Sequence, residues 1–369
     1  MDDRIDPKKI KRIAINTGGG DAPGLNAVIR AVTLAAIERD IEVWGISHGY
    51  RGLLDTEQLM PLTRAAVRGI THLGGTILGT ANKGNPFEYP LKTSDGQTKV
   101  IDVSDQVVEN FREKRLDALI CIGGDGSLRI AQKFIEKGIP IIGVPKTIDN
   151  DLSGTVITFG FDTAVTTATE AIDKLHSTAE AHERVMVVEV MGRYAGWIAL
   201  ESGLSGTADV ILIPEIPYDL HKIAEKIMRR EVAGRHFAIV VVAEGAKPRG
   251  GELMVTGPKE AGREIHLGGA GQYVADQIAQ LTGKETRSLV LGHLQRGGSP
   301  TTFDRLLGLR FGAAAIRALG EGQINVMVAL DPPRVKTIPL SKAIETMKSV
   351  PLDCDTILTA RALDVCLGD

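Results

Sequence analysis

Short apolar runs rich in β-branched residues recur along this chain, separated by stretches such as Gly24–Asp40, whose apolar residues fall at helical spacing. Continuous apolar runs are typical of strands buried on both faces. Their alternation with helices predicts an α/β fold built from βαβ units with mostly parallel sheets. The runs are Arg12–Asn16, Glu42–Ser47, Ala118–Ile122, Ile139–Val144, Arg184–Val190, Asp209–Ile213, Phe237–Ala243, Ser288–His293 and Asn325–Leu330.

The series of strands is too long for one compact sheet, and a chain of 369 residues has room for two domains. The helical segment from Asp162 to about Ala181 is a plausible divider between them. We therefore expect two doubly wound, Rossmann-like domains, with the active site in the cleft between them.

Composition excludes several classes of function. The formal net charge of −3 gives no electrostatic case for a nucleic-acid or membrane partner, and the longest apolar runs are too short to cross a bilayer. The three cysteines form no CxxC pair, which favours a reduced setting over a disulfide framework or a zinc site. We expect a cytoplasmic protein.

Two glycine-rich turns follow predicted strands. In Ala118–Gln132, the strand leads into Gly124, Asp125, Gly126 and Ser127, and a helix begins there. Glycines let the backbone approach a phosphate, and a helix N-terminus attracts anions. A carboxylate in such a site is repulsive unless it holds a cation, so Asp125 is a candidate Mg²⁺ ligand. Taken alone, the turn could also be no more than a tight connection.

The second turn, Gly18–Asp21, brings another backbone amide, that of Gly20, to the same region. Two such turns in one half of the protein favour a polyphosphate ligand. Neither matches GxxxxGK[ST] or GxGxxG, which disfavours a Walker-type NTPase and a dinucleotide dehydrogenase.

Polar residues also follow a third strand, where Lys146, Thr147, Asp149 and Asp151 occur within six positions of one another. Two carboxylates two residues apart on extended backbone point to the same side. One can bind metal through water, and the other can take a proton from an attacking hydroxyl. An Asx turn that caps the next element remains an alternative for Asn150 and Asp151.

Basic residues gather around two later strands. Arg184 and Arg287 precede their strands, whereas Arg193, His293 and Arg296 follow theirs. Arginine suits bidentate phosphate capture. Residues at opposite strand ends can hardly reach one ligand within a single subunit, which favours a contribution from a neighbouring subunit. Two Gly- and Pro-rich loops, 74–99 and 244–269, are either functional or surface insertions.

Together these segments resemble the 6-phosphofructokinase family from about Ile13 to Gly320, with "TGGGDAPGLNA", "GGDGS", "PKTIDND", "VEVMGRYAG" and "VLGHLQRGGSP" in family order. The family transfers a phosphoryl group to the 1-hydroxyl of fructose 6-phosphate, giving fructose 1,6-bisphosphate. The resemblance implies a donor-binding domain of residues 1–160 plus about 273–323. It implies a sugar-phosphate-binding domain of residues 161–272 plus about 324–369.

The resemblance also implies residue roles. Asp149 would be the catalytic base, with Lys146 and Thr147 assisting and Asp151 beside it. The donor, ATP, would bind with Mg²⁺ on Asp125 and would contact Gly20, Gly124, Gly126, Ser127, Asn82 and Lys83. The sugar would bind to Met191, Gly192, Arg193 and Glu244. Its 6-phosphate would bind His293 and Arg296, together with Arg184 and Arg287 from an adjacent subunit. The family resemblance implies that this homo-oligomer is a tetramer.

Three features depart from well-known bacterial ATP-dependent members. Asn82, followed by Lys83, stands where those members have an arginine, so Lys83 or Lys146 would compensate the charge of the transferring group. Leu34 replaces an effector-binding arginine, which puts the family's allosteric control in doubt. The loop 246–268 is longer than in those members, and its role is unassigned.

Two residues bear on the identity of the phosphoryl donor, and they favour different donors. In this family a glycine at the position of Gly126 leaves room for the nucleoside of ATP, whereas Lys146 resembles a lysine of pyrophosphate-using members. Steric exclusion should outweigh an added charge, so we expect ATP. The alternatives are a pyrophosphate-dependent enzyme, a catalytically silent regulatory subunit, a GGDG-type lipid or NAD kinase, and an enzyme acting on another sugar phosphate such as sedoheptulose 7-phosphate.

Overall fold

The computed structural model describes residues 4–81, 84–92, 98–255 and 267–369, and the chain divides into two compact units. Unit 1 comprises Met1–Thr147, Leu152–Gly160 and Arg296–Met347. Unit 2 comprises Ile148–Asp151, Phe161–Gln295 and Lys348–Asp369. Each unit is built around its own sheet.

Unit 1 contains a seven-stranded sheet in the order β13-β12-β7-β6-β1-β2-β3. Its strands from β12 to β2 are parallel, and the two edge strands, β13 and β3, are antiparallel to their neighbours. The bounds are β1 Arg12–Thr17, β2 Glu42–Ile46, β3 Leu59–Pro61, β6 Ala118–Gly123, β7 Ile141–Pro145, β12 Val326–Asp331 and β13 Arg334–Pro339.

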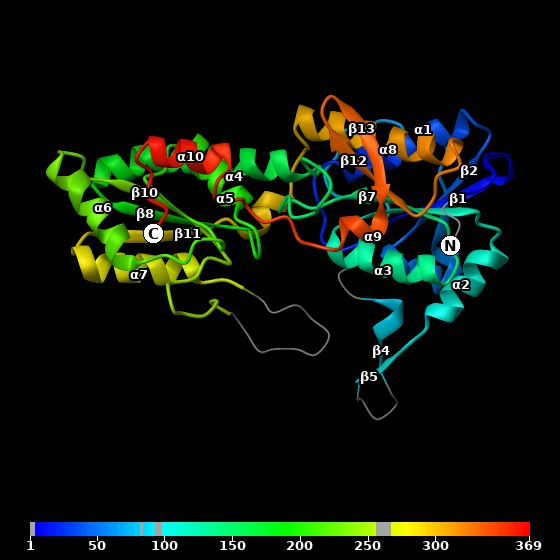
Figure 1. Ribbon diagram of the computed structural model, residues 1–369, viewed down its shortest axis with the longest axis horizontal. Coiled ribbons are helices and arrows are strands. Elements are labelled where there is room, and N and C mark those ends of the chain that lie inside the picture. The colour runs from blue at the N-terminus through cyan, green and yellow to red at the C-terminus, as the bar shows by residue number, and fades with distance from the viewer. Residues whose placement is uncertain (1–3, 82–83, 93–97, 256–266) are drawn as a thin grey trace. The chain divides into compact units, whose positions relative to one another are not determined.

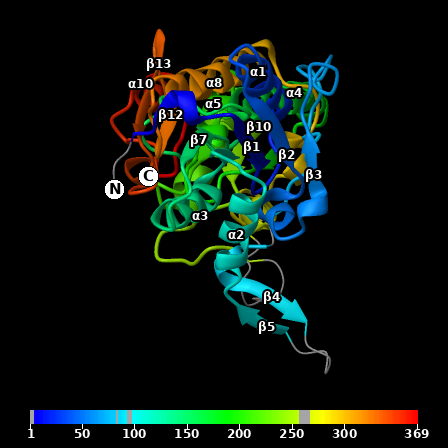
Figure 2. The ribbon, with the colours of Figure 1, turned by 90° about the vertical axis from the view of Figure 1, so that its right-hand side faces the viewer.

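Helices cover both faces of this sheet (Figures 1 and 2). Helices α1 (Leu25–Ile37) and α8 (Thr302–Gly320) lie side by side on one face. Helices α2 (Ser104–Glu113), α3 (Asp125–Glu136) and α9 (Leu340–Ala343) lie on the other. Figure 2 shows a hairpin of β4 (Tyr89–Lys92) and β5 (Thr98–Ile101) projecting beyond α2. Short 3₁₀ helices are η1 (Pro7–Lys9), η2 (Gly49–Leu53), η3 (Thr56–Gln58) and η4 (Pro86–Glu88).

The close approach of α1 and α8 depends on glycine. A Cβ at Gly312 would lie 2.7 Å from the Val28 carbonyl oxygen and 2.8 Å from the Ala31 Cβ. Phe311, which is fully buried, packs into the apolar cluster between these helices and the sheet. Gly312 therefore lets the two backbones meet where any side chain would separate them.

Unit 2 contains a parallel four-stranded sheet in the order β11-β8-β10-β9. The strands are β8 Val185–Val190, β9 Val210–Leu212, β10 Ala238–Ala243 and β11 Thr286–Val290. Helices α4 (Phe161–His182), α5 (Trp197–Ser205) and α10 (Asp355–Ala362) lie on one face, and α6 (Leu220–Val232) and α7 (Ala270–Thr282) lie on the other (Figure 1).

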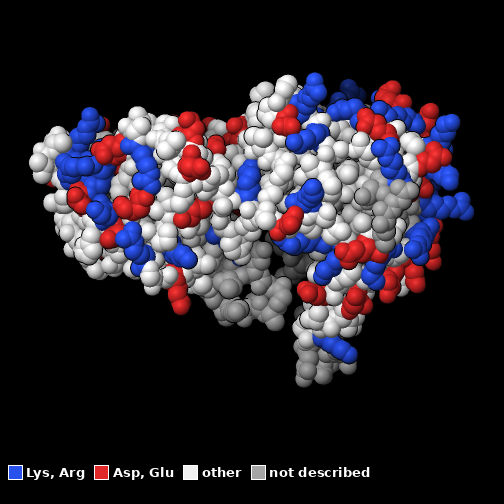
Figure 3. Space-filling view, in the orientation of Figure 1, with Lys and Arg blue, Asp and Glu red and all other residues white. Residues whose placement is uncertain are grey.

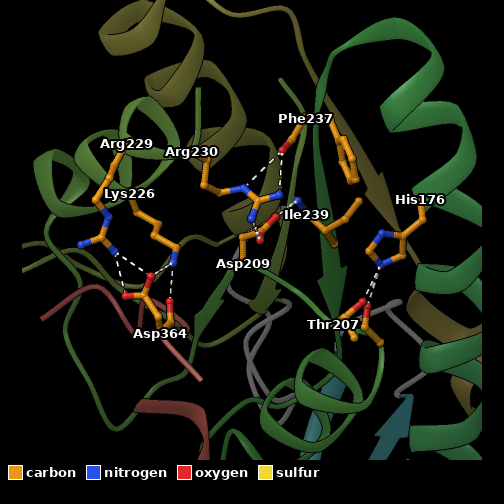
Figure 4. Close-up of polar contacts among 10 residues, drawn as sticks. His176, Thr207, Asp209, Lys226, Arg229, Arg230, Phe237, Ile239 and Asp364 are labelled. Atoms are coloured by element: carbon orange, nitrogen blue, oxygen red, sulfur yellow. Dashed lines mark hydrogen bonds and ion pairs between the residues drawn. The ribbon is translucent and has the colours of Figure 1, made fainter. Parts of the chain in front are cut away.

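The end of the chain pairs with the β9 edge of this sheet. The Cys366 amide donates to the Asp209 carbonyl (3.0 Å), and the Ile211 amide donates to the Cys366 carbonyl (2.9 Å). Just before this segment, the Asp364 carboxylate is held by Lys226 and Arg229 of α6 (Figure 4). The C-terminal residues thus satisfy an edge that would otherwise present unpaired backbone groups.

Asp209 anchors the start of β9 through a second ion pair. Its carboxylate contacts Arg230 Nη1 at 2.6 Å and accepts from the Ile239 amide at 3.0 Å (Figure 4). Burial raises the pKa of Asp209, and these two partners oppose that rise. Both side chains are largely buried, so removing one partner would leave an uncompensated charge.

The expected fold class is confirmed: both units are α/β with mostly parallel sheets, and every run expected as a strand forms one. The expected division between residues 160 and 161 agrees with the structure, and the other boundaries differ. Residues 273–295 belong to unit 2 because β11 pairs with β8, and residues 324–347 belong to unit 1 because β12 pairs with β7. The expectation that β11 is buried on both faces was wrong, since it is an edge strand and Val290 is 55% exposed.

Charges of both signs are interspersed on the face drawn in Figure 3, a mixture that produces only weak net fields at a distance. In the residues that the structure describes, no helix is both long and apolar enough to cross a membrane.

Replacing Gly312 with Ala should lower the free energy of unfolding by about 1–3 kcal/mol, because the added methyl group overpacks the α1–α8 contact. Urea unfolding measures this change. Gly126→Ala in α3 is the matched control, since nothing lies within 4 Å of a Cβ there. The control should be neutral or slightly stabilising, because alanine has the higher helix propensity. Equal behaviour of the two variants would contradict the packing argument.

Candidate active site

The three polar turns predicted from the sequence lie together at the carboxyl edge of the unit 1 sheet. They follow β1, β6 and β7, which are neighbours in the sheet. The Gly18 amide donates to the Ile122 carbonyl (2.9 Å), and the Lys146 amide donates to the Gly123 carbonyl (2.9 Å). The backbone of each turn is therefore bonded directly to the next strand, at the edge where ligands bind in parallel sheets.

Two glycines in these turns make room for the side chain of Ser127. A Cβ at Gly18 would lie 2.4 Å from Ser127 Oγ, and one at Gly123 would lie 2.3 Å from Ser127 Cβ. Gly124 caps α3 from extended backbone, so the first turn of the helix points its amides at this edge. By contrast, Gly126 is exposed, with open space where a Cβ would be.

Positive charge is directed at the β1 turn from two sides. The buried Lys146 donates through Nζ to the Gly20 carbonyl, and Arg296 donates through Nη1 to the Asp21 carbonyl (3.2 Å). A Cβ at Gly20 would lie 3.0 Å from Arg296 Nη1, so a larger residue would push the guanidinium away. The predicted donor residues Asn82 and Lys83 lie outside the described residues.

Asp125 begins α3 and pairs with Arg129 one turn later, at 2.7 Å between Oδ2 and Nε. Among the described residues, no group of three or more His, Cys, Asp or Glu side chains could hold a metal. A single carboxylate at a helix N-terminus fits Mg²⁺ bound with a phosphate ligand, because this ion usually binds one or two carboxylates and takes its other ligands from phosphates and water. Arg129 is half-exposed and can turn away at little cost.

The third turn is divided between the units. Lys146 and Thr147 belong to unit 1, where the Thr147 carbonyl accepts from Thr158 Oγ1 at 2.7 Å. The next four residues, Ile148–Asp151, belong by their contacts to unit 2. Asp149 and Asp151 are half-buried, and Asn150 between them has a left-handed backbone with φ of 52°. Asparagine tolerates that conformation better than most residues.

The predicted sugar-binding residues gather at the carboxyl edge of the unit 2 sheet. The Met191 amide donates to Gln295 Oε1 (3.2 Å), and the Gly245 amide donates to the Gly192 carbonyl (3.1 Å). These contacts join the ends of β8, β10 and η5 (Gly292–Arg296). Met191, Gly192, Arg193, Glu244 and His293 all follow strands at this edge.

Arg184 and Arg287 lie at the opposite edge of the same sheet. Both contact Glu285, Arg184 through Nε at 2.9 Å and Arg287 through Nη2 at 2.5 Å. The hydrogen bond from Arg184 is the main reason that the pKa of Glu285 is lowered. Strand β8 has six residues, or roughly 20 Å, between the two edges. The expectation that Arg287 precedes its strand was wrong, because it is the second residue of β11.

Comparison with known proteins agrees with this geometry. A family model described as phosphofructokinase matches residues 12–319. The chain belongs to the phosphofructokinase family. It is 52% identical to a protein of Chloroflexus aurantiacus named ATP-dependent 6-phosphofructokinase, over 98% of this chain and 99% of that one.

Relatives in the phosphofructokinase family include both donor types. A protein of Amycolatopsis methanolica named pyrophosphate–fructose 6-phosphate 1-phosphotransferase is 49% identical, over 92% of this chain and 96% of that one. Among solved structures, phosphofructokinase from Pichia pastoris in the T-state has a TM-score of 0.77 and 32% identity. That match covers 96% of this chain and only 37% of the Pichia chain.

Sequence reasoning missed several residues that hold the phosphofructokinase turns in place. Gln295 accepts from the Met191 amide, Thr158 donates to the Thr147 carbonyl, and Lys348 donates through Nζ to Asn150 Oδ1 (2.8 Å). Gln295 lies in the quoted "GHLQRGGSP" motif and could have been singled out. Thr158 and Lys348 carry no local signal, since their partners are distant in sequence or visible only in the fold.

Proposed function

We propose that this protein is an ATP-dependent 6-phosphofructokinase, which transfers the γ-phosphoryl group of ATP to the 1-hydroxyl of fructose 6-phosphate. The products are fructose 1,6-bisphosphate and ADP. The observation that carries the proposal is the meeting of three turns at one sheet edge, with buried Lys146 joined to Gly20 and open space at Gly126. The 52% identity to the Chloroflexus enzyme supports ATP as the donor.

The donor phosphates bind the amides around Gly20 and the first turn of α3 at Gly124–Ser127. Helix N-termini and glycine turns favour such anions. Asp125 holds Mg²⁺, which neutralises charge on the phosphates when it is bound. Lys146 donates to the Gly20 carbonyl from a buried position, where its charge is little screened and can stabilise the transferring group. Asn82 and Lys83 remain predicted donor contacts.

Asp149 accepts the proton of the sugar 1-hydroxyl as that oxygen attacks the phosphorus, with Thr147 and Asp151 beside it. Met191, Gly192, Arg193 and Glu244 hold the sugar, while His293 and Arg296 hold its 6-phosphate. The shared edge of the unit 2 sheet supports the roles of the residues from Met191 to His293, whereas Arg296 belongs to unit 1 and its role follows from the family resemblance alone. The presence of Asp125 and Asp149 argues against a catalytically silent subunit. The reduced cysteines fit a cytoplasmic location, which is part of the proposal.

The enzyme is proposed to be a homotetramer in which Arg184 and Arg287 of one subunit reach the 6-phosphate bound by another. Their position at the opposite edge from His293 supports this arrangement. So does the exposure of β11, with Arg287 at 58% and Val290 at 55%, because an exposed apolar edge strand is suited to a subunit contact.

Asp149→Asn should lower kcat by roughly 10²- to 10⁴-fold, the usual contribution of a positioned general base, with little change in either KM. Steady-state kinetics on the purified variant measure both constants. A variant that retains most of its kcat would show that Asp149 is not the base.

The wild-type enzyme should use ATP with a far higher kcat/KM than pyrophosphate. Gly126→Asp should damage ATP use much more than any pyrophosphate activity, because only the nucleotide passes the open position beside Gly126. Gly126→Ala controls for loss of the glycine itself. A wild-type preference for pyrophosphate would overturn the donor assignment.

Mixing Arg287→Ala subunits with Asp149→Asn subunits, each inactive alone, should restore some activity, because hybrids contain sites with both residues intact. Subunit exchange is verified with differently tagged chains. Hybrids that exchange and stay as inactive as their parents would rule out the shared site.

A further inference from the structure

Lys348 contacts the segment that contains the proposed base. Its backbone amide donates to the Asp151 carbonyl (2.9 Å), and its Nζ donates to Asn150 Oδ1 (2.8 Å). Both contacts lie within unit 2, to which Ile148–Asp151 and Lys348 belong. One lysine therefore holds the two residues that directly follow Asp149 through separate hydrogen bonds.

Lys348 is itself held by α5. Trp197 Nε1 donates to the Lys348 carbonyl (3.2 Å), and Lys348 Nζ lies 5.5 Å from the centre of the Trp197 ring. Two residues further along, the Val350 amide donates to Glu215 Oε1 (2.8 Å), and the same carboxylate accepts from the Gly196 amide (3.1 Å). Trp197 begins α5, shortly after the proposed sugar-binding residues Met191–Arg193. Lys348 thus links the Asp149 segment to that loop.

The ammonium group of Lys348 is largely buried, which disfavours its charged form. Burial lowers the pKa of Lys348 to about 8, while Asp151 and Glu201 act in the opposite direction. Hydrogen bonds to a charged group contribute more than neutral ones, and losing the donor leaves a buried acceptor unsatisfied. The left-handed backbone of Asn150, which is 4% exposed, is a conformation that the surroundings must maintain.

We propose that Lys348 is a positioning residue for phosphoryl transfer: it fixes Asn150 and Asp151 against the sugar-binding part of unit 2 and so fixes the carboxylate of Asp149. This role rests on the proposed function of Asp149. It requires that Lys348 affect the chemical step with little effect on the binding of ATP, whose proposed contacts are in unit 1.

Lys348→Met removes the donor and keeps most of the apolar stem. It should lower kcat by roughly 10- to 100-fold, as expected for loss of a hydrogen bond from a charged donor, with the KM for ATP unchanged. Lys348→Arg should recover part of kcat. Lys222→Met, which changes an exposed lysine of α6 in the same unit, is the matched control and should be neutral. Thermal unfolding should show Lys348→Met folded with a modestly lower Tm, because Asn150 Oδ1 loses its donor, and should leave the Tm of Lys222→Met unchanged.

A double-mutant cycle tests the route through Asn150. Asn150→Gly removes the acceptor while allowing the left-handed backbone, so it should lower kcat without unfolding the turn. Combined with Lys348→Met, it should cost much less than the sum of the two single effects, because both remove the same bond. If Lys348→Met fails to fold, Asn150→Gly alone must show the kcat loss at unchanged KM for ATP.

Two results would overturn the proposal: a kcat of Lys348→Met within about twofold of wild type, or additive effects in the cycle. The proposal would also be wrong if Lys348→Met lowered kcat and Tm together and Lys348→Arg restored neither, because Lys348 would then have only a structural role. The Asp149→Asn background separates this proposal from the assignment of the base. In that background, Lys348→Met should lower kcat little further. A high kcat of Asp149→Asn alone would instead reject Asp149 as the base, and the coupling between Lys348 and Asn150 would still be measured by the double-mutant cycle.

Discussion

The candidate donor site depends on the side-by-side pairing of β7, β6 and β1 in one parallel sheet. Parallel neighbours end at the same edge, so the pairing brings together turns that are about 100 residues apart in the sequence. The spacing is so close that Gly18 and Gly123 leave room for one serine side chain, Ser127. Strand register and glycine content are therefore one constraint, because a side chain at either glycine would collide with Ser127 and separate the turns.

Much of this arrangement could be predicted because its signals are local. Buried strands such as β6 and β10 are continuous apolar runs, and the turns after β1 and β6 are marked by consecutive glycines. Strand β11 was misjudged for a physical reason. The run Ser288–His293 contains Leu289, Val290 and Leu291, but β11 is an edge strand with exposed side chains, and a short apolar sequence does not reveal whether its strand is central or at an edge.

The boundary after residue 160, where α4 begins, could be predicted from the sequence. The other domain boundaries and the role of Lys348 could not, because they depend on long-range contacts. The chain passes between the units several times, and the four residues Ile148–Asp151 join unit 2 through Lys348, about 200 positions away. The assignment of 273–295 likewise follows from which strand β11 pairs with, a matter of topology that local pattern does not determine.

Glu285 gives the two arginines of the amino edge a resident counter-ion. One carboxylate bridges Arg184 and Arg287 and holds both near one point, but it offsets only one of their two positive charges, so a net positive charge remains. Under the shared-site proposal, a sugar phosphate on a neighbouring subunit would have to replace a bond already made. The affinity of the sugar phosphate would then reflect the difference between phosphate and carboxylate as partners for arginine. Glu285 would thus set the ligand concentration at which the arginines of one subunit engage the sugar phosphate of another.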